Sequence, residues 1–231
     1  MTVGTDTRLR MQETKVQVTM DGVALVENDE KVETLLGCQI EPNLKWHKQV
    51  DKLQVKLKTR LAALQKLRGL RQLDLRKRIA EGIFLSILSY CLPVFGGCSK
   101  GELEALQVMQ NKAARIVANL GQRDNRVFIY RQVGWMTVRQ LIFYHSALAT
   151  YRIRQSKEPE YLNNIMNRNN RANKIIISNT NLSLAKNSYC FRAAAQWNSL
   201  PEDIRNSCKI GQFKSRLRLW IHQNVPQFQD Q

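Results

Sequence analysis

The chain has 231 residues and a mass of 26.8 kDa, which allows one large or two small domains and excludes a small disulfide-stapled scaffold. Its 36 Lys and Arg against 19 Asp and Glu give a net charge of +17, and such an excess favours a polyanionic partner, usually nucleic acid. No apolar run reaches the roughly 18 residues of a membrane span, and the first residues lack a signal or transit pattern. We therefore expect a soluble intracellular protein, nuclear or cytoplasmic.

The cysteines and histidines do not form a recognisable metal or disulfide pattern. Five cysteines are an odd number, and most of them lie in apolar stretches: Cys38, Cys91, Cys98, Cys190 and Cys208. A zinc site needs clustered pairs such as C-x2-C, whereas here the closest cysteines are Cys91 and Cys98 and the histidines are scattered. We predict buried free thiols, no bound metal and no cofactor in this chain.

The positive charge is clustered along the sequence. Residues 1–44 hold 4 basic and 8 acidic side chains, whereas residues 45–80 hold 12 basic and 2 acidic ones. Residues 81–120 are balanced at 3 and 3, and residues 121–231 hold 17 basic and 6 acidic side chains. A charge that served solubility alone would be spread evenly, so the clustering favours a localised anion-binding face.

Residues 1–43 have the pattern of short strands. The sequence here predicts a hairpin and further short strands. The evidence is apolar alternation at 1–5, apolar runs at 15–20, 23–27 and 34–40, and the turn signal Asp21-Gly22 between the first two runs. These strands are too few to bury much apolar surface, so they are expected to be the edge of a larger sheet.

From Pro42 onward the apolar period becomes helical. A single stripe predicts a helix over 44–68, with Asn43 as its N-cap and Gly69 as its stop. The stripe consists of Val50, Leu53, Leu57, Leu61, Leu64 and Leu67. Opposite it fall Lys48, Lys52, Thr59 and Lys66, flanked by Lys45, Lys56 and Lys58, with only Asp51 to interrupt them. A merely solvated face usually mixes both signs, so this one favours contact with nucleic acid.

Three further helices are predicted in the same bundle. The first covers 74–91, with Asp74 as N-cap, Arg76, Lys77 and Arg78 in its first turns and Pro93 as its stop; these cations suit a phosphate ligand. It is expected to return antiparallel to the 44–68 helix after a connection at 69–73. The next covers 99–120 with a Ser99–Glu102 capping box, and the last covers 137–155 with Thr137 as N-cap. His145 lies on the apolar face of that last helix and is interpreted as a packed histidine.

The rest of the chain divides into two parts. Nine Asn in residues 163–189 predict a loop or linker, assigned here to 156–188, and a small helical region follows over 189–231. No Asp-Asp pair, phosphate-binding glycine loop, H-E-x-x-H or G-x-S-x-G motif occurs in the sequence. By its residues alone the chain is interpreted as a mostly α binding or structural fragment.

Four segments, in order, resemble the reverse transcriptases of non-LTR (LINE-like) retrotransposons. They are LLGCQIEPNLKWHKQVDKL (35–53), LSYCLPVFGG (88–97), LQVMQNKAARIV (106–117), and FRAAAQWNSLPEDIRNS with FKSRLRLWI (191–221). Each is mainly hydrophobic patterning, but together they cover most of the chain in the family's order. The resemblance departs at Phe95, where the family most often has Trp, and the family's aromatic-x-Asp-Asp motif is missing.

The resemblance implies a palm remnant at 1–43, a helical thumb-like bundle at 44–155 and a helical C-terminal region. It places Leu36 and Gly37 in a hairpin corresponding to the primer grip, and the 45–68 helix in the thumb. The expected function is non-specific binding of a template–primer duplex, RNA–DNA or DNA, through backbone contacts. Without the Asp pair that would hold Mg²⁺ in the parent polymerase, the chain alone is expected to be inactive in primer extension.

Two other classes of function stay open at this point. One is a non-catalytic helical scaffold derived from a retroelement. The other is a basic membrane-surface module, which is disfavoured because the basic helix has few aromatic residues on its apolar face. For nucleic-acid binding, the sequence nominates Lys45, Lys48, Lys52, Lys56, Lys66, Arg76, Lys77 and Arg78.

Overall fold

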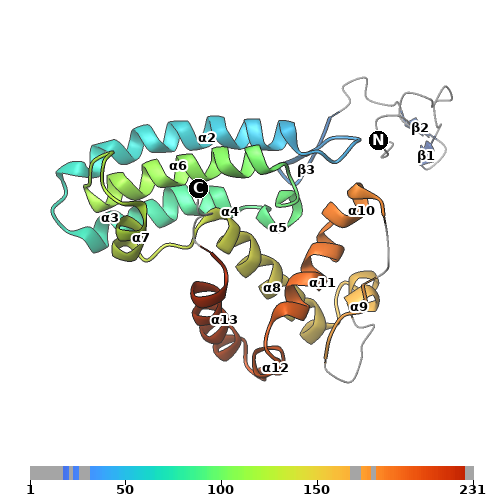
Figure 1. The fold of residues 1–231 in the computed structure, drawn as a ribbon. Coiled ribbons are helices and arrows are strands. Elements are labelled where there is room, and N and C mark those ends of the chain that lie inside the picture. The colour runs from blue at the N-terminus through green and yellow to red at the C-terminus, as the bar shows by residue number, and fades with distance from the viewer. Residues whose placement is uncertain (1–17, 21–22, 26–31, 167–172, 178–180, 227–231) are drawn as a thin grey trace.

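The computed structural model describes residues 18–20, 23–25, 32–166, 173–177 and 181–226 (Figure 1). The fold is mostly α, as predicted, with two small antiparallel hairpins near the N-terminus. β1 (Val18–Met20) pairs with β2 (Val23–Leu25), and β3 (Glu33–Leu35) pairs with β4 (Cys38–Ile40). The alternation predicted at 1–5, and residues 15–17, 21–22 and 26–27 of the first predicted hairpin, lie outside the described residues.

The single strand predicted over 34–40 is wrong, because the chain reverses in its middle. Leu35 pairs with Cys38, which leaves Leu36 and Gly37 as a two-residue turn. Their φ angles are +48° and +82°, and a two-residue hairpin turn of type I′ requires positive φ at both positions. Glycine adopts this conformation freely, whereas Leu36 adopts it at a steric cost.

The four helices predicted between residues 44 and 155 are confirmed, and none of these residues is in a strand. They correspond to α2 (His47–Gln65), to the run α3 (Leu73–Ala80), η2 (Glu81–Leu85) and α4 (Ser86–Ser89), to α6 (Lys100–Ala118) and to α8 (Val138–Ser156). The chain turns through the 3₁₀ segment η1 (Lys66–Gly69) and then returns antiparallel to α2 (Figure 1).

The starts of the two helices that have a local capping motif were predicted correctly. α6 and α8 begin with complete capping boxes, Ser99 with Glu102 and Thr137 with Gln140. The start of α2 differs: Asn43 caps no helix, and its side chain instead accepts a hydrogen bond from the Lys45 N–H at 3.1 Å. The Lys48 N–H at the start of α2 donates to the carboxylate of Glu41 at 3.1 Å, so the capping group stands farther upstream.

The helix predicted over 74–91 ends earlier and by another mechanism. Its middle, η2, has π-helical hydrogen bonding, and the helix ends at Ser89 because Tyr90 is extended, with φ −65° and ψ 127°. Asp74 lies in the first turn of α3 and does not cap it. Pro93 is not the stop, since it lies at the start of the short helix α5 (Leu92–Phe95), where proline is tolerated.

Three further helices lie in segments that were not predicted to be helical. α7 (Arg126–Val133) begins at Asn125, whose side chain accepts from the Val127 N–H at 2.8 Å. α9 (Glu160–Met166) and α10 (Ser183–Asn187) fall within the segment assigned to a loop or linker over 156–188. The C-terminal region contains α11 (Tyr189–Ser199), α12 (Glu202–Arg205) and α13 (Ile210–Asn224).

The buried apolar residues form two cores. The first is built by β4, α2, the α3–α4 run, α5, α6, α7 and the start of α8. The second is built by the rest of α8 together with α9, α11, α12 and α13. α8 therefore belongs to both, and its Ile142 and Phe143 face different cores.

Candidate nucleic-acid interface

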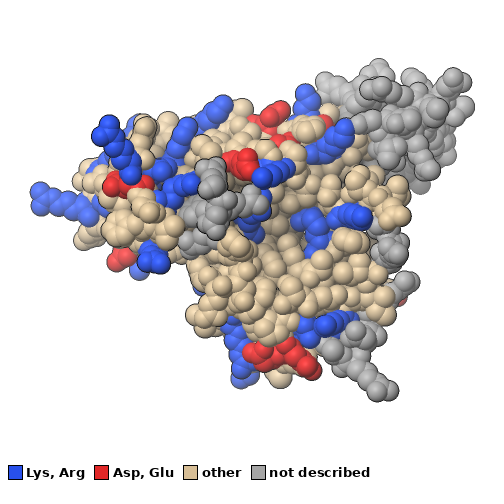
Figure 2. Space-filling view, in the orientation of Figure 1, with Lys and Arg blue, Asp and Glu red and all other residues tan. Residues whose placement is uncertain are grey.

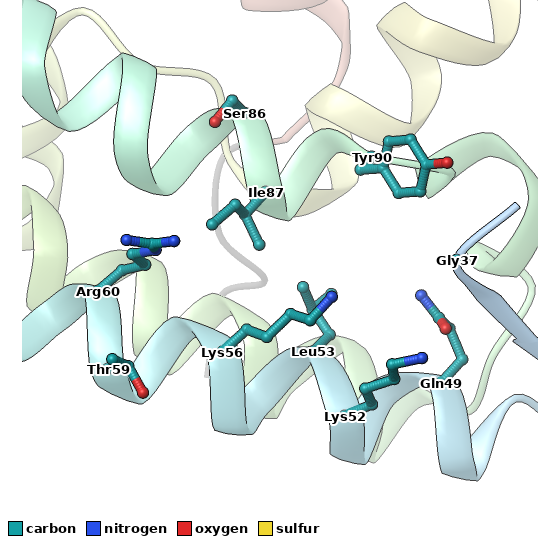
Figure 3. A pocket seen from close by; sticks show the side chains of 10 residues that line it. All are labelled: Gly37, Gln49, Lys52, Leu53, Lys56, Thr59, Arg60, Ser86, Ile87 and Tyr90. Atoms are coloured by element: carbon teal, nitrogen blue, oxygen red, sulfur yellow. The ribbon is translucent and has the colours of Figure 1, made fainter.

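A groove of about 470 Å³ lies between α2, α4 and the β3–β4 turn. The apolar stripe of α2 positions this helix, since Val50, Leu53 and Leu57 are buried against the first core. The floor and walls are formed by ten residues (Figure 3): Gly37, Gln49, Lys52, Leu53, Lys56, Thr59, Arg60, Ser86, Ile87 and Tyr90.

Three cations line the groove along α2. Lys52, Lys56 and Arg60 are spaced four residues apart, so they lie in one row along the helix surface, at a rise of about 6 Å per step. Figure 3 shows Lys52 and Lys56 extending from α2 toward the space below α4. None of the ten lining residues is an acid, so nothing in the lining neutralises this row.

The far wall of the groove is the turn of the β3–β4 hairpin. The Tyr90 hydroxyl, at the end of α4, donates a hydrogen bond to the Leu36 carbonyl and so ties the turn to the bundle. On the other side, the buried Gln49 side chain accepts a hydrogen bond from the Gln39 N–H at 2.8 Å. These two bonds fix the hairpin relative to α2 and α4, so the groove has a defined shape.

The Cys38 thiol behind the turn does not add negative charge. Burial, and after it the neighbouring Cys91 thiol, raise the pKa of the Cys38 thiol to about 11. Cys38 is therefore a neutral thiol at pH 7. The cysteines are free, as predicted, but the prediction that they are buried holds only for Cys38 and Cys98, and Cys208 is exposed. The positive row on α2 keeps its full effect on an anion in the groove.

The structure brings together only part of the predicted site. Lys52, Lys56 and Gly37 line the groove, with Leu36 beside them at the exposed tip of the turn. Lys45 and Lys48 are exposed near the start of α2, and Lys66 and Arg78 are exposed at the other end of the bundle, so all four lie outside the groove lining.

Two of the predicted residues lie elsewhere. Arg76 is buried, with 6% exposure, and its guanidinium donates to the carbonyls of Val117 at 2.7 Å and Arg71 at 3.2 Å and to that of Leu70. Its prediction as a phosphate ligand is wrong, because it holds the start of α3 to the end of α6. Lys77 is half-buried, and its Nζ would lie 3.3 Å from a Cβ added at Gly134, at the end of α7.

Sequence reasoning missed Arg60, Gln49, Ser86 and Tyr90. Arg60 carried a usable signal, since it follows Lys52 and Lys56 at the same four-residue step. The other three had none: Gln49 is a neutral side chain in a basic helix, and Ser86 and Tyr90 come from a helix that returns to α2 only in three dimensions.

Comparisons with known proteins found no matching family model, no matching curated protein and no matching solved structure. Within the described part of the chain, no group of three or more His, Cys, Asp and Glu side chains is placed to hold a metal ion. No helix there combines the length and the apolar character needed to cross a membrane.

Proposed function

We propose that this chain binds the phosphate backbone of duplex nucleic acid, without sequence specificity, through the groove beside α2. The observation that carries the proposal is the row of Lys52, Lys56 and Arg60 in a groove with no acid in its lining. Their step of about 6 Å is comparable to the spacing of successive phosphates along one strand, so the row suits a continuous polyanion better than a single small anion.

The resemblance to non-LTR reverse transcriptases suggests the kind of duplex. In that family the region after the primer-grip hairpin is the thumb, which follows a template–primer duplex. We therefore propose an RNA–DNA hybrid or a DNA duplex as the ligand, held by backbone contacts, and no polymerase chemistry by this chain.

A charge-matched pair of triple variants tests the proposal. K52Q/K56Q/R60Q removes the row in the groove, and K48Q/K58Q/K112Q removes three exposed cations outside its lining. Affinity for a duplex is measured by fluorescence anisotropy over a range of salt concentrations. Because each phosphate contact contributes about −0.9 to the slope of log K against log salt, the groove variant should flatten the slope by about 2–3 units.

The control variant should change the slope by less than about 1 unit, and circular dichroism should show that both variants are folded. Equal effects of the two variants would mean that only net charge matters, and the groove would then not be the site. Tighter binding to vesicles containing acidic lipid than to duplex would support the membrane-surface class instead and overturn the proposal.

A further inference from the structure

A second group of exposed cations lies at the end of the bundle opposite the hairpin. The elements there are η1, α3 and α7, and all three pack on α6 (Figure 1). Residues 66–78 hold six Lys and Arg against one Asp, and residues 121–131 hold three Arg against one Asp. Six arginines at this end are exposed, Arg126 among them, and we call the other five the arginine end: Arg68, Arg71, Arg78, Arg123 and Arg131.

Two internal contacts bring these segments together. The Arg76 guanidinium, by donating to the Val117 carbonyl at 2.7 Å, fixes α3 on the end of α6. Lys77 packs against Gly134 and so joins α3 to the end of α7. Arginines that are far apart in sequence are thereby held on one end of the molecule, where Figure 2 shows several Lys and Arg side chains with fewer acidic ones among them.

The charge of the arginine end is only partly balanced by acids, since its segments hold nine Lys and Arg against two Asp. Among the described residues, no salt bridge joins any of its five arginines to a carboxylate. Of the two local acids, Asp124 accepts a hydrogen bond from the Gly121 N–H at 2.6 Å. A solvated surface normally pairs opposite charges, whereas uncompensated arginines repel one another until a polyanion binds.

The spacing between the two basic regions suits one extended ligand. Arg60, at the near end of the groove row, is eight residues or about 12 Å from Arg68, and Lys52, at the far end of the row, is 16 residues or about 24 Å from it on a nearly continuous helix. At a rise of about 3.4 Å per base pair, this distance is about seven base pairs of duplex. The planar guanidinium group of an arginine can donate two hydrogen bonds to one phosphate, so arginine is suited to such a contact.

We propose that the arginine end is a second phosphate-binding site, which holds the duplex about seven base pairs from Lys52. This inference rests on the proposed function of the groove. It adds a definite footprint: a duplex of about 6 base pairs that covers the whole groove row from Lys52 ends before Arg68, whereas a longer one reaches both sites. Engagement of both sites makes the second contact intramolecular, which raises affinity without any new contact at the first.

The test compares two duplexes, of about 6 and about 16 base pairs, each closed by a loop so that the short one stays paired. The variants are R68Q/R71Q/R78Q, R123Q/R131Q, the groove variant K52Q/K56Q/R60Q and the control K48Q/K58Q/K112Q. We expect each arginine-end variant to weaken binding of the long duplex about tenfold and of the short duplex less than about twofold. The groove variant should weaken both.

The outcomes separate the two proposals. If the unaltered protein binds neither duplex, or if the groove variant binds both as well as the unaltered protein, the proposed function of the groove fails. If the groove variant acts as expected but the arginine-end variants weaken both lengths equally, or neither, the second site is overturned while the groove stands. Equal losses from the control and the arginine-end variants also overturn the second site.

Discussion

Arg76 and Arg78 stand two residues apart on α3, yet their guanidinium groups have opposite environments. The Arg76 side chain is directed into the bundle, where backbone carbonyls at the end of α6 and before α3 accept its hydrogen bonds. These are end-of-helix and turn carbonyls that would otherwise lack partners, and a cation near a helix C-terminus also interacts favourably with the helix dipole. Arg78 is exposed to solvent.

Substitution by Gln should therefore separate the two positions. We expect Arg76→Gln to lower the free energy of unfolding by about 1.5–3 kcal/mol, because it removes charge-assisted hydrogen bonds to buried carbonyls. Arg78→Gln should change it by no more than about 0.5 kcal/mol. Urea denaturation followed by circular dichroism measures both, and equal effects of the two substitutions would contradict the structural role of Arg76.

The same pair of residues shows why part of the candidate site was not predictable. Hydrophobic periodicity assigns each residue to a face of its helix, and a charged Arg is assigned to the exposed face. Nothing in the sequence indicates that Arg76 is buried, because its partners at residues 70, 71 and 117 are backbone carbonyls. By contrast, Lys52 and Lys56 were found because the stripe of α2 is regular and leaves its other face to solvent.

At the scale of elements, local capping motifs determined which boundaries could be predicted. Ser99 and Thr137 each bond to the residue three positions on, so sequence suffices to place the starts of α6 and α8. The start of α2 depends on Glu41, seven residues from the N–H whose hydrogen bond it accepts, and α4 ends at the extended Tyr90. Neither residue type is typical of such an end, so these boundaries were missed.

Helix α8 also contains a titratable group with a shifted pKa. Burial lowers the pKa of His145 below its usual 6.5, and Arg152 lowers it further. Protonation of His145 is therefore less favourable in the folded protein than in the unfolded chain. The free energy of unfolding is highest above pH 6.5 and decreases as the pH falls below it.

Replacing this histidine should reduce the acid sensitivity of the fold. We expect the melting temperature of the unaltered protein to fall between pH 7.5 and pH 5.5, and His145→Gln to show a smaller fall, because Gln does not titrate. His222→Gln on α13 is the matched control, since His222 is exposed. A fall of the same size in the His145 variant would contradict this assignment.

For the whole molecule, one arginine and one glycine add a contact between the two cores beside the helix α8 that they share. Arg192 on α11 donates from Nη2 to the carbonyls of Pro93 at 2.7 Å and Val94 at 3.3 Å, and from Nε to that of Asn187 at 3.0 Å. Gly97 makes room for this contact: a Cβ there would lie 2.3 Å from the Asn187 carbonyl oxygen. The C-terminal helices are thus held on α5.

A single methyl group should disturb this contact. We expect Gly97→Ala to lower the free energy of unfolding by about 1–3 kcal/mol, because backbone atoms must move to admit it. Gly101→Ala is the control: nothing lies within 4 Å of its Cβ, and within α6 it should stabilise by about 0.5–1 kcal/mol. Chemical denaturation followed by tryptophan fluorescence compares them, and a neutral Gly97→Ala would show that the contact between α5 and α11 is loose.

The sharing of α8 between two cores constrains insertions and deletions in this helix. One residue inserted near its middle would rotate the second half by about 100° relative to the first, since a turn holds 3.6 residues. Ile142 and Phe143 could then no longer face their separate cores at once. Substitutions along α8 can be compensated one at a time by neighbouring side chains, but a change of length cannot. The number of residues in α8 therefore sets the rotation of the C-terminal helices about the bundle.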